Sequence, residues 1–352
     1  MAEGAAKGRI VAFDGLRGLA ALSVICMHTT IGATPARGFL AVDFFFLLSG
    51  FVIARAYETR LEAGAGLRWF FRVRMVRLYP LYIFGMLLGC LSLLSLPATL
   101  VRAAVFNIFF LPDLFPTDRS LFPLNGPAWS LCAEVAVNLL YALGGYRLST
   151  RALAAVVALA GAVLAAVTLT AGTANLGWHQ TWIDLAVAAS RVMFGFPLGV
   201  LLYRLHRCGR IPDLGHSPIT PLILTLAMFF ISIEGAAVVD PVLILVATPA
   251  LFLLLLTARA PRRRFSVVCE QLGRLSYPLY VVHFPLISLF NNVKPPIALA
   301  ARLMQIPKLA PIILMVALGA SLWIEPQGRR WLNRVLGSSP AGEGPCVSAT
   351  SA

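Results

Sequence analysis

The chain has 352 residues, of which 59% are hydrophobic and only 12% are charged, and its mean hydropathy is +0.82. A soluble globular domain carries about a quarter charged residues, so the composition excludes an ordinary soluble protein and indicates an all-α polytopic membrane protein. The net charge of +14 would suggest nucleic acid in a soluble chain. No aromatic-and-basic nucleic-acid motif accompanies it, so arginine-rich cytoplasmic loops explain the charge better.

Ten apolar runs, each near the roughly 20 residues needed to cross a bilayer, predict about ten transmembrane helices. They cover residues 16–33, 39–56, 80–97, 127–146, 152–172, 182–203, 219–235, 241–257, 275–292 and 309–325. The run 99–111 is shorter and carries Arg102 and Asn107, so we expect it to be re-entrant or interfacial. One membrane-embedded domain is expected over 1–336, followed by a disordered cytoplasmic tail over 337–352.

The placement of basic residues predicts the orientation of the chain. With the N-terminus inside, most of the 29 Lys and Arg residues fall in cytoplasmic segments, as the positive-inside rule requires. Both termini are therefore predicted to be cytoplasmic, and the first span is expected to be retained because no clear cleavage site follows it. Arg191 falls within a span and needs a partner there.

The six cysteines form no CxxC pair and no metal-type spacing, so neither a disulfide nor a metal site is expected. Most of them fall in apolar runs, where a free cysteine behaves as a small apolar residue. Cys132 is accordingly expected to pack rather than to act as a nucleophile.

The first span carries three ionisable residues on one face. Arg17 and His28 are eleven residues apart, which is close to three helical turns, and Asp14 and Arg17 form an i, i+3 pair. The rise from Arg17 to His28 is roughly 16 Å, about half the hydrocarbon thickness. Snorkelling of Arg17 and simple packing of His28 are the alternatives, but an aligned polar stripe favours function.

Two acidic residues are predicted to lie at the depth of His28. NGPAWSLCAE enters the membrane from outside and places Glu134 roughly 10 Å below the outer boundary, against roughly 8 Å for His28. A carboxylate beside an imidazole can orient it as a general base. Asp43 also lies near the outer boundary and is either a second such acid or a helix cap. Trp129 is expected to be an interfacial anchor or a substrate-binding residue.

Two further groups are candidates for binding. Arg74 and Arg77 are an i, i+3 pair just before the third span, and guanidinium groups bind phosphates bidentately. Simple positive-inside charge is the alternative. His283 lies near mid-membrane in LSYPLYVVHFP, where it is either a substrate-binding group or a packing histidine.

Five stretches in chain order resemble the acyltransferase-3 family of integral-membrane O-acyltransferases, and together they cover residues 13 to about 325. The family pattern after PAWSL has two adjacent acidic residues, whereas Glu134 is followed here by Val135. The matching stretches are FDGLRG with the Arg17 to His28 spacing, VDFFFLLSGFVI, RVRMVRLYP with Arg74 and Arg77, PAWSLCAE with Glu134, and LSYPLYVVHFP.

The resemblance implies a bacterial inner-membrane enzyme that moves an acyl group, usually acetyl, from cytoplasmic acyl-CoA to a hydroxyl of an envelope or exported polysaccharide. On this basis Arg17, Arg74 and Arg77 are expected to hold CoA, and His28 to act with Glu134 or Asp43. His28 would be either the general base or the carrier of a transient acyl group.

Two alternatives remain. The acceptor could be a small hydroxylated molecule such as a macrolide. The chain could also be a transporter or flippase, although it lacks the repeated halves and paired broken helices typical of that class.

Overall fold

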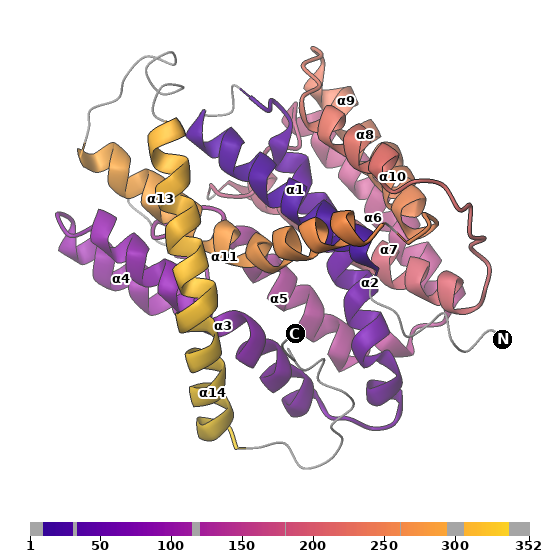
Figure 1. The fold of residues 1–352 in the computed structure, drawn as a ribbon, viewed down its shortest axis with the longest axis horizontal. Helices are drawn as coiled ribbons and strands as arrows, with labels where there is room; N and C mark the ends of the chain where they lie inside the picture. The colour runs from indigo at the N-terminus through magenta and orange to yellow at the C-terminus, as the bar shows by residue number, and fades with distance from the viewer. Residues whose placement is uncertain are drawn as a thin grey trace.

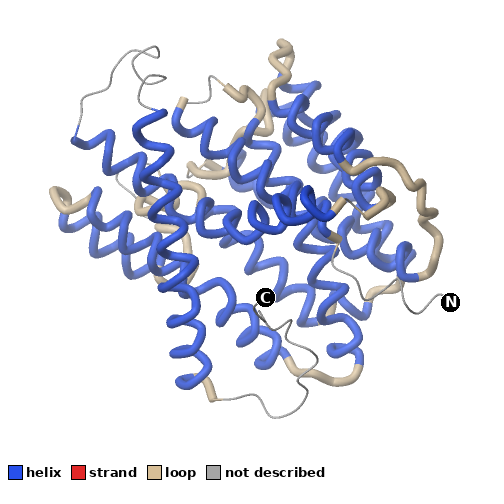
Figure 2. The backbone as a smooth tube through the Cα atoms, in the orientation of Figure 1, coloured by secondary structure: helices blue, strands red, loops and turns tan. Residues whose placement is uncertain are grey.

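The computed structural model describes residues 10–30, 34–114, 120–179, 181–260, 262–293 and 306–337. Within these ranges the regular structure is helical, apart from one isolated bridge between Ser120 and His179 (Figure 2). The all-α class predicted from composition is therefore confirmed. The predicted tail beyond Gly337 lies outside the described residues, as do the first nine residues.

The helices pack around one large hydrophobic core and a smaller second cluster between α1, α11 and α13, and Figure 1 shows their arrangement. Their bounds in chain order are α1 Val11–Thr29, the 3-10 helix η1 Gly38–Leu40, α2 Ala41–Glu62, α3 Leu67–Ser92, α4 Pro97–Asn107, α5 Ala128–Leu143, the 3-10 helix η2 Gly145–Arg147, α6 Thr150–Ala171, α7 Trp182–Arg207, α8 Ile219–Phe229, α9 Ala236–Val242, the π-helix η3 Leu243–Ala247, α10 Thr248–Leu256, α11 Arg263–Val293, α13 Ile306–Gly319, the π-helix η4 Ala320–Ile324 and α14 Glu325–Val335.

Several helices make this a multi-pass membrane protein, but the predicted count of ten is not confirmed. α5 has 16 residues and α8 has 11, fewer than the roughly 20 that a straight crossing needs. α4, which forms from the 99–111 run, also has 11. The seven described stretches that are long and apolar enough to span are Val11–Thr29, Gly38–Glu62, Leu67–Ser92, Thr150–Ala171, Trp182–Arg207, Ala236–Leu256 and Leu309–Val335.

The helix that contains the third predicted span begins at Leu67, well before the predicted residue 80. α2 continues to Glu62, and α3 starts at Leu67 after a short turn, so the expected basic loop is largely helical. Hydropathy places a boundary where arginines gather, but a helix can extend through them, and an acidic partner lowers the cost of an arginine that is buried there. Arg74 is such a case, because it is buried and ion-paired inside α3.

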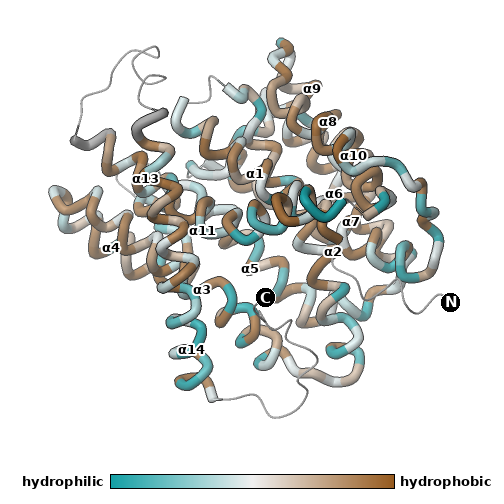
Figure 3. Tube along the Cα trace, viewed as in Figure 1, coloured by the Kyte–Doolittle hydropathy of each residue, from teal (hydrophilic) through white to brown (hydrophobic). Residues whose placement is uncertain are grey.

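The arrangement of the helices brings distant parts of the chain together. In Figure 1, α11 runs across the molecule at a large angle to the near-vertical α13 and α14, and it packs on α1. Hydrophobic residues predominate on α4, α8 and α10, whereas hydrophilic residues gather along α14 (Figure 3). The surface of α4, α8 and α10 is therefore suited to lipid.

α2 and α7 cross at glycines. A Cβ atom on Gly50 would lie 2.0 Å from the Phe196 carbonyl oxygen, and one on Gly199 would lie 2.0 Å from the Leu47 carbonyl oxygen. The two helix backbones therefore touch, as is usual where small residues mediate helix packing in membranes. This contact fixes the separation of α2 and α7.

We expect Gly199→Ala to destabilise the protein by about 2 kcal/mol or more, because the added methyl group overlaps backbone that cannot yield. Gly161→Ala is the matched control, since its Cβ would find its nearest neighbours at 3.4 Å, an ordinary contact. Thermal unfolding in detergent measures both. A Gly199→Ala protein as stable as the Gly161→Ala protein would contradict the close crossing.

Candidate active site

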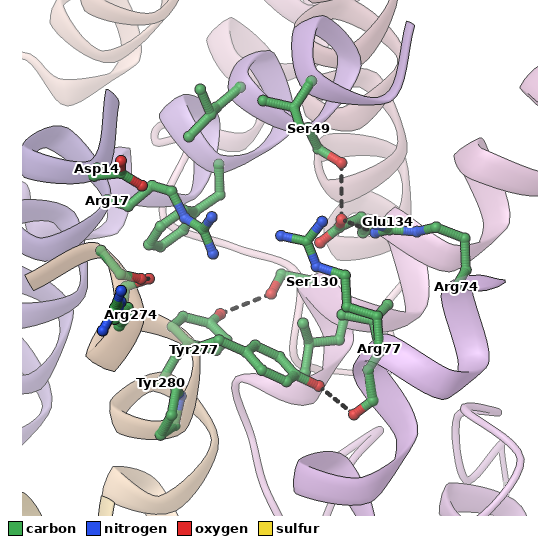
Figure 4. A pocket seen from close by; sticks show the side chains of 18 of the residues that line it. Asp14, Arg17, Ser49, Arg74, Arg77, Ser130, Glu134, Arg274, Tyr277 and Tyr280 are labelled. Atoms are coloured by element: carbon green, nitrogen blue, oxygen red, sulfur yellow. Dashed lines mark hydrogen bonds and ion pairs between the residues drawn. The ribbon is translucent and has the colours of Figure 1, made fainter. Parts of the chain in front are cut away.

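A cavity of about 390 Å³ lies between α1, α2, α3, α5, α11 and α14 (Figure 4). Apolar side chains of α2, among them Phe45, Phe46 and Val52, form one wall. The polar residues that line the cavity are Asp14, Arg17, Ser49, Arg74, Arg77, Ser130, Glu134, Arg274, Ser276, Tyr277, Tyr280, Ser321, Glu325 and Arg329. The cavity therefore combines an apolar wall with a concentration of cationic groups.

Arginines outnumber acids on the cavity wall. In Figure 4 the guanidinium groups of Arg17 and Arg77 point into the cavity, and Arg274 lies on the α11 side. Glu325 forms an ion pair with Arg329 and interacts electrostatically with Arg17 and Arg77. An excess of guanidinium groups in one recess favours an anionic ligand, above all a phosphate.

Arg74 and Glu134 form an ion pair within this cavity. The Arg74 Nη2 atom lies 2.8 Å from Glu134 Oε1, and the Ser49 hydroxyl donates to the same oxygen at 2.7 Å. Arg74 was expected to hold a phosphate and Glu134 to orient His28. In the structure these two residues bond to each other, because α3 and α5 pack together at this point and Ser49 of α2 reaches the same carboxylate.

His28 has a different partner from the one expected. Its Nδ1 atom lies 2.9 Å from His283 Nε2, and the two rings stack with centroids 5.1 Å apart. His283 Nδ1 lies 3.1 Å from the carbonyl oxygen of Leu279, one turn earlier in α11. His283 is fully buried, whereas His28 is partly exposed and meets the ring of Phe284 edge-on.

Tyr280 connects the cavity to the histidine pair. Its hydroxyl lies in the cavity, 2.7 Å from the Ser130 hydroxyl. Its ring centroid lies 5.7 Å from that of His283. Tyr280 therefore contacts the cavity on one side and His283 on the other, while neither histidine is among the residues that line the cavity.

Two features of the sequence hold α11 in position. Pro285 has no N–H group, so the carbonyl of Val281, four residues earlier, lacks its helical donor. The buried side chain of Asn125 supplies one, with Nδ2 donating to the Val281 oxygen at 3.0 Å. The proline near His283 and the asparagine of NGPAWS thus tie α11 to the start of α5.

Asp43 and Trp129 lie around Arg191, away from the cavity wall. Arg191 donates to Asp43 Oδ1 from Nε at 3.0 Å and to Oδ2 from Nη2 at 2.7 Å. Its guanidinium also donates to the carbonyls of Phe39 and Ala174, and it lies 5.6 Å from the Trp129 ring centroid. The predicted need of Arg191 for a partner is confirmed, and the expected pairing of Asp43 with His28 is replaced by this contact.

Sequence reasoning missed several residues of the site. Arg274, Tyr277 and Tyr280 follow one another at three-residue spacing on α11 and line the cavity together, and i, i+3 neighbours of this kind are a signal in the sequence for adjoining positions on a helix surface. Tyr277 donates to the Leu78 carbonyl at 2.7 Å and joins α11 to α3. The i, i+4 pair of Glu325 and Arg329 lies where the last helix was expected to leave the membrane.

A multi-pass helical protein with an arginine-lined cavity beside a pair of histidines has groups suited to binding an anionic ligand and to moving a proton. The profile of the acyltransferase-3 family, described as an acyltransferase domain, matches residues 10–325. The chain belongs to this family, and it is an acyltransferase.

Curated relatives agree with this assignment. Acyltransferase MdmB of Streptomyces mycarofaciens is 27% identical over 320 residues, which cover 79% of each chain. Protein 2 in the picA locus of Rhizobium radiobacter is 39% identical over 178 residues, 44% of this chain and 93% of the relative. Peptidoglycan O-acetyltransferase OatA of Listeria monocytogenes is 30% identical over 114 residues, 31% of this chain and 16% of that protein. No solved structure matches.

Asp43→Asn should destabilise the protein, because it leaves the buried Arg191 guanidinium without its charged partner. We expect a loss of about 3 kcal/mol or more in unfolding free energy, while activity per folded molecule stays within a few-fold of the unmodified protein. Thermal unfolding and a transfer assay on the monodisperse fraction measure the two quantities. A fully stable but inactive Asp43→Asn protein would restore the catalytic role first expected of Asp43.

Proposed function

We propose that the protein transfers an acetyl group from cytoplasmic acetyl-CoA to a hydroxyl of an envelope or exported polysaccharide, in the bacterial inner membrane. The observation that carries this proposal is the cationic cavity whose far end, at Tyr280, adjoins the pair of His28 and His283. Such a layout suits a donor with phosphates at one end and a reactive thioester at the other. With the basic helix ends facing the cytoplasm, the donor enters from that side.

The acyl donor would lie in the cavity in one orientation. Its phosphates would bind Arg17, Arg77 and Arg274, which line the cavity. The uncharged arm would lie along the apolar wall of α2, past Phe45. The thioester would then reach Ser130 and Tyr280, beside the histidine pair.

Arg74 has a different role in this scheme from the one first expected. Its guanidinium is held by Glu134 and its side chain is buried, so it stabilises the middle of the cavity. Glu134 would act as the counter-charge that keeps Arg74 in place, with Ser49 closing the arrangement from α2.

His28 would carry the chemistry. It would accept the proton of the acceptor hydroxyl while the hydroxyl oxygen attacks the thioester carbonyl carbon. The C–O ester bond forms, the C–S bond breaks, and the proton passes from His28 to the departing CoA sulfur. In the alternative sequence His28 itself attacks first, carries the acyl group, and passes it to the hydroxyl. Rapid quenching with radiolabelled donor separates the two, since only the second leaves label on the protein.

A polysaccharide acceptor is supported by OatA, whose name states that it O-acetylates peptidoglycan. The second candidate acceptor is a small hydroxylated molecule. With this acceptor the binding of the acyl donor is unchanged, and only the molecule that approaches the exposed side of His28 differs. Release of CoA that rises with added glycan rather than with small alcohols would support the polysaccharide.

We expect His28→Ala to lower the rate of acyl transfer by about 10²–10⁴-fold, the usual contribution of a general base, with little change in CoA affinity. Thiol release from acetyl-CoA in lipid nanodiscs measures the rate, and calorimetry measures the affinity. His179→Ala is the control, because His179 lies in an exposed loop away from the cavity. Full activity of His28→Ala would remove His28 from both chemical schemes.

Arg77→Ala should raise the dissociation constant of CoA about tenfold, equivalent to the loss of about 1.4 kcal/mol of charge-assisted bonding. Arg68→Ala is the matched control, since Arg68 is an exposed arginine of the same helix that does not line the cavity. Titration of CoA into both proteins gives the comparison. Equal affinities would contradict phosphate binding by Arg77.

A further inference from the structure

We infer that His283 is a positioning residue that fixes the proton of His28 on Nδ1 and leaves Nε2 as the reactive nitrogen. The inference rests on the proposed function for its chemical consequence, since it names which atom of His28 reacts. The hydrogen bonds themselves are independent of that function. They run in one direction from the Leu279 carbonyl through His283 to His28.

The first link sets the proton of His283. Its Nδ1 atom lies 3.1 Å from the carbonyl oxygen of Leu279. A carbonyl oxygen only accepts hydrogen bonds, so the Nδ1 atom must carry the proton and donate it. The Leu279 carbonyl lies within reach of this ring because it belongs to the preceding turn of the same helix.

The second link follows from burial. His283 is fully buried, and its contacts are the Leu279 carbonyl, His28 and the rings of Tyr280 and Phe284. None of these groups carries a negative charge that would balance an imidazolium, and a buried uncompensated charge is costly. The ring is therefore neutral and holds a single proton, on Nδ1. Its Nε2 atom is a hydrogen-bond acceptor.

The third link determines the state of His28. Its Nδ1 atom lies 2.9 Å from His283 Nε2, and since that nitrogen accepts, His28 Nδ1 must donate. A neutral His28 then has an unprotonated Nε2 atom. The stacked His283 ring and the edge of Phe284 hold the plane of the His28 ring.

The chemical consequence is specific to one atom. Nε2 of His28 has the lone pair, so it takes the proton of the acceptor hydroxyl as the O–H bond breaks and the C–O bond forms. The imidazolium that results keeps its Nδ1–H bond to His283, and Nε2 gives its proton to the CoA sulfur as the C–S bond breaks. His283 thus orients His28, as the aspartate of a catalytic triad orients its histidine.

Magnetic resonance of histidine labelled with ¹³C and ¹⁵N, in protein reconstituted in lipid nanodiscs, tests the tautomer directly. The chain has five histidines, and the His28 signals are those lost in His28→Asn. We expect His28 to be protonated on Nδ1 in the unmodified protein. In His283→Leu, which offers no acceptor, we expect the form protonated on Nε2 to appear. A His28 protonated on Nε2 in the unmodified protein would overturn the inference.

Activity provides the second readout. His283→Leu should lower kcat about 100-fold with little change in KM for acetyl-CoA. His283→Gln should stay within about tenfold of the unmodified protein, because its amide oxygen lies as many bonds from the main chain as Nε2 and accepts the His28 proton. Equal losses in the two variants would indicate a structural role and contradict positioning.

The two readouts separate the inference from the function on which it draws. His28 protonated on Nδ1 together with full transfer by His28→Ala would leave the tautomer correct and the proposed chemistry wrong. Loss of transfer in His28→Ala, with His28 protonated on Nε2, would leave the chemistry and overturn the role of His283.

Discussion

Pairing of charge in a low-dielectric interior is the constraint on which the rest of this structure depends. An ionised side chain inside the membrane is expensive unless an opposite charge and hydrogen bonds surround it. α2 provides such groups at three depths. Asp43 holds Arg191, Ser49 bonds to the Glu134 that holds Arg74, and Glu58 holds Arg204 at 3.2 Å.

Two of these pairs join α2 to α7 on either side of their glycine crossing. The Asp43 pair lies towards one end of the contact and the Glu58 pair towards the other, where Tyr141 also donates to Glu58 at 2.6 Å. Between them the backbones meet at Gly50 and Gly199. The α2–α7 unit is thereby fixed in separation and in register, and it presents the apolar wall of the cavity as a rigid surface.

The opposite wall is built differently. α1 and α11 carry Arg17, Arg274 and Tyr280 towards the cavity and His28 and His283 beyond it. The charged groups therefore line the cavity, while the two imidazoles bond to each other and to a carbonyl. In the proposed scheme, the arginines that bind the donor lie in charged surroundings and the two histidines lie in uncharged ones. The same two helices, α1 and α11, carry both sets of residues.

The sequence was informative about which residues are unusual and less so about their partners. A charged or imidazole side chain in an apolar run is visible, which is why Arg191 was expected to be paired. The sequence also predicts how deep in the membrane a residue lies. Two residues at the same depth need not be in contact, because the rotation of each helix about its axis decides which neighbour each residue faces. Glu134 and His28 illustrate this, since one faces Arg74 and the other faces α11.

The start of α3 could not be predicted from hydropathy for a related reason. Its arginine-rich first turns are polar in composition, and hydropathy alone ends a span there. The helix nevertheless begins at Leu67, and within it Arg74 pairs with Glu134, a residue far along the chain that a local window does not include. The three-residue spacing of Arg274, Tyr277 and Tyr280, by contrast, was present in the sequence and indicates the part of α11 that lines the cavity.

The distance in sequence between the two histidines has a consequence for biogenesis. His28 and His283 are separated by 255 positions, and a membrane protein is inserted from its N-terminus as it is synthesised. His28 therefore enters the bilayer long before its partner exists. The hydrogen-bonded pair can form only after α11 has joined the bundle, so a nascent chain that stalls before that point holds the first histidine without the residue that orients it.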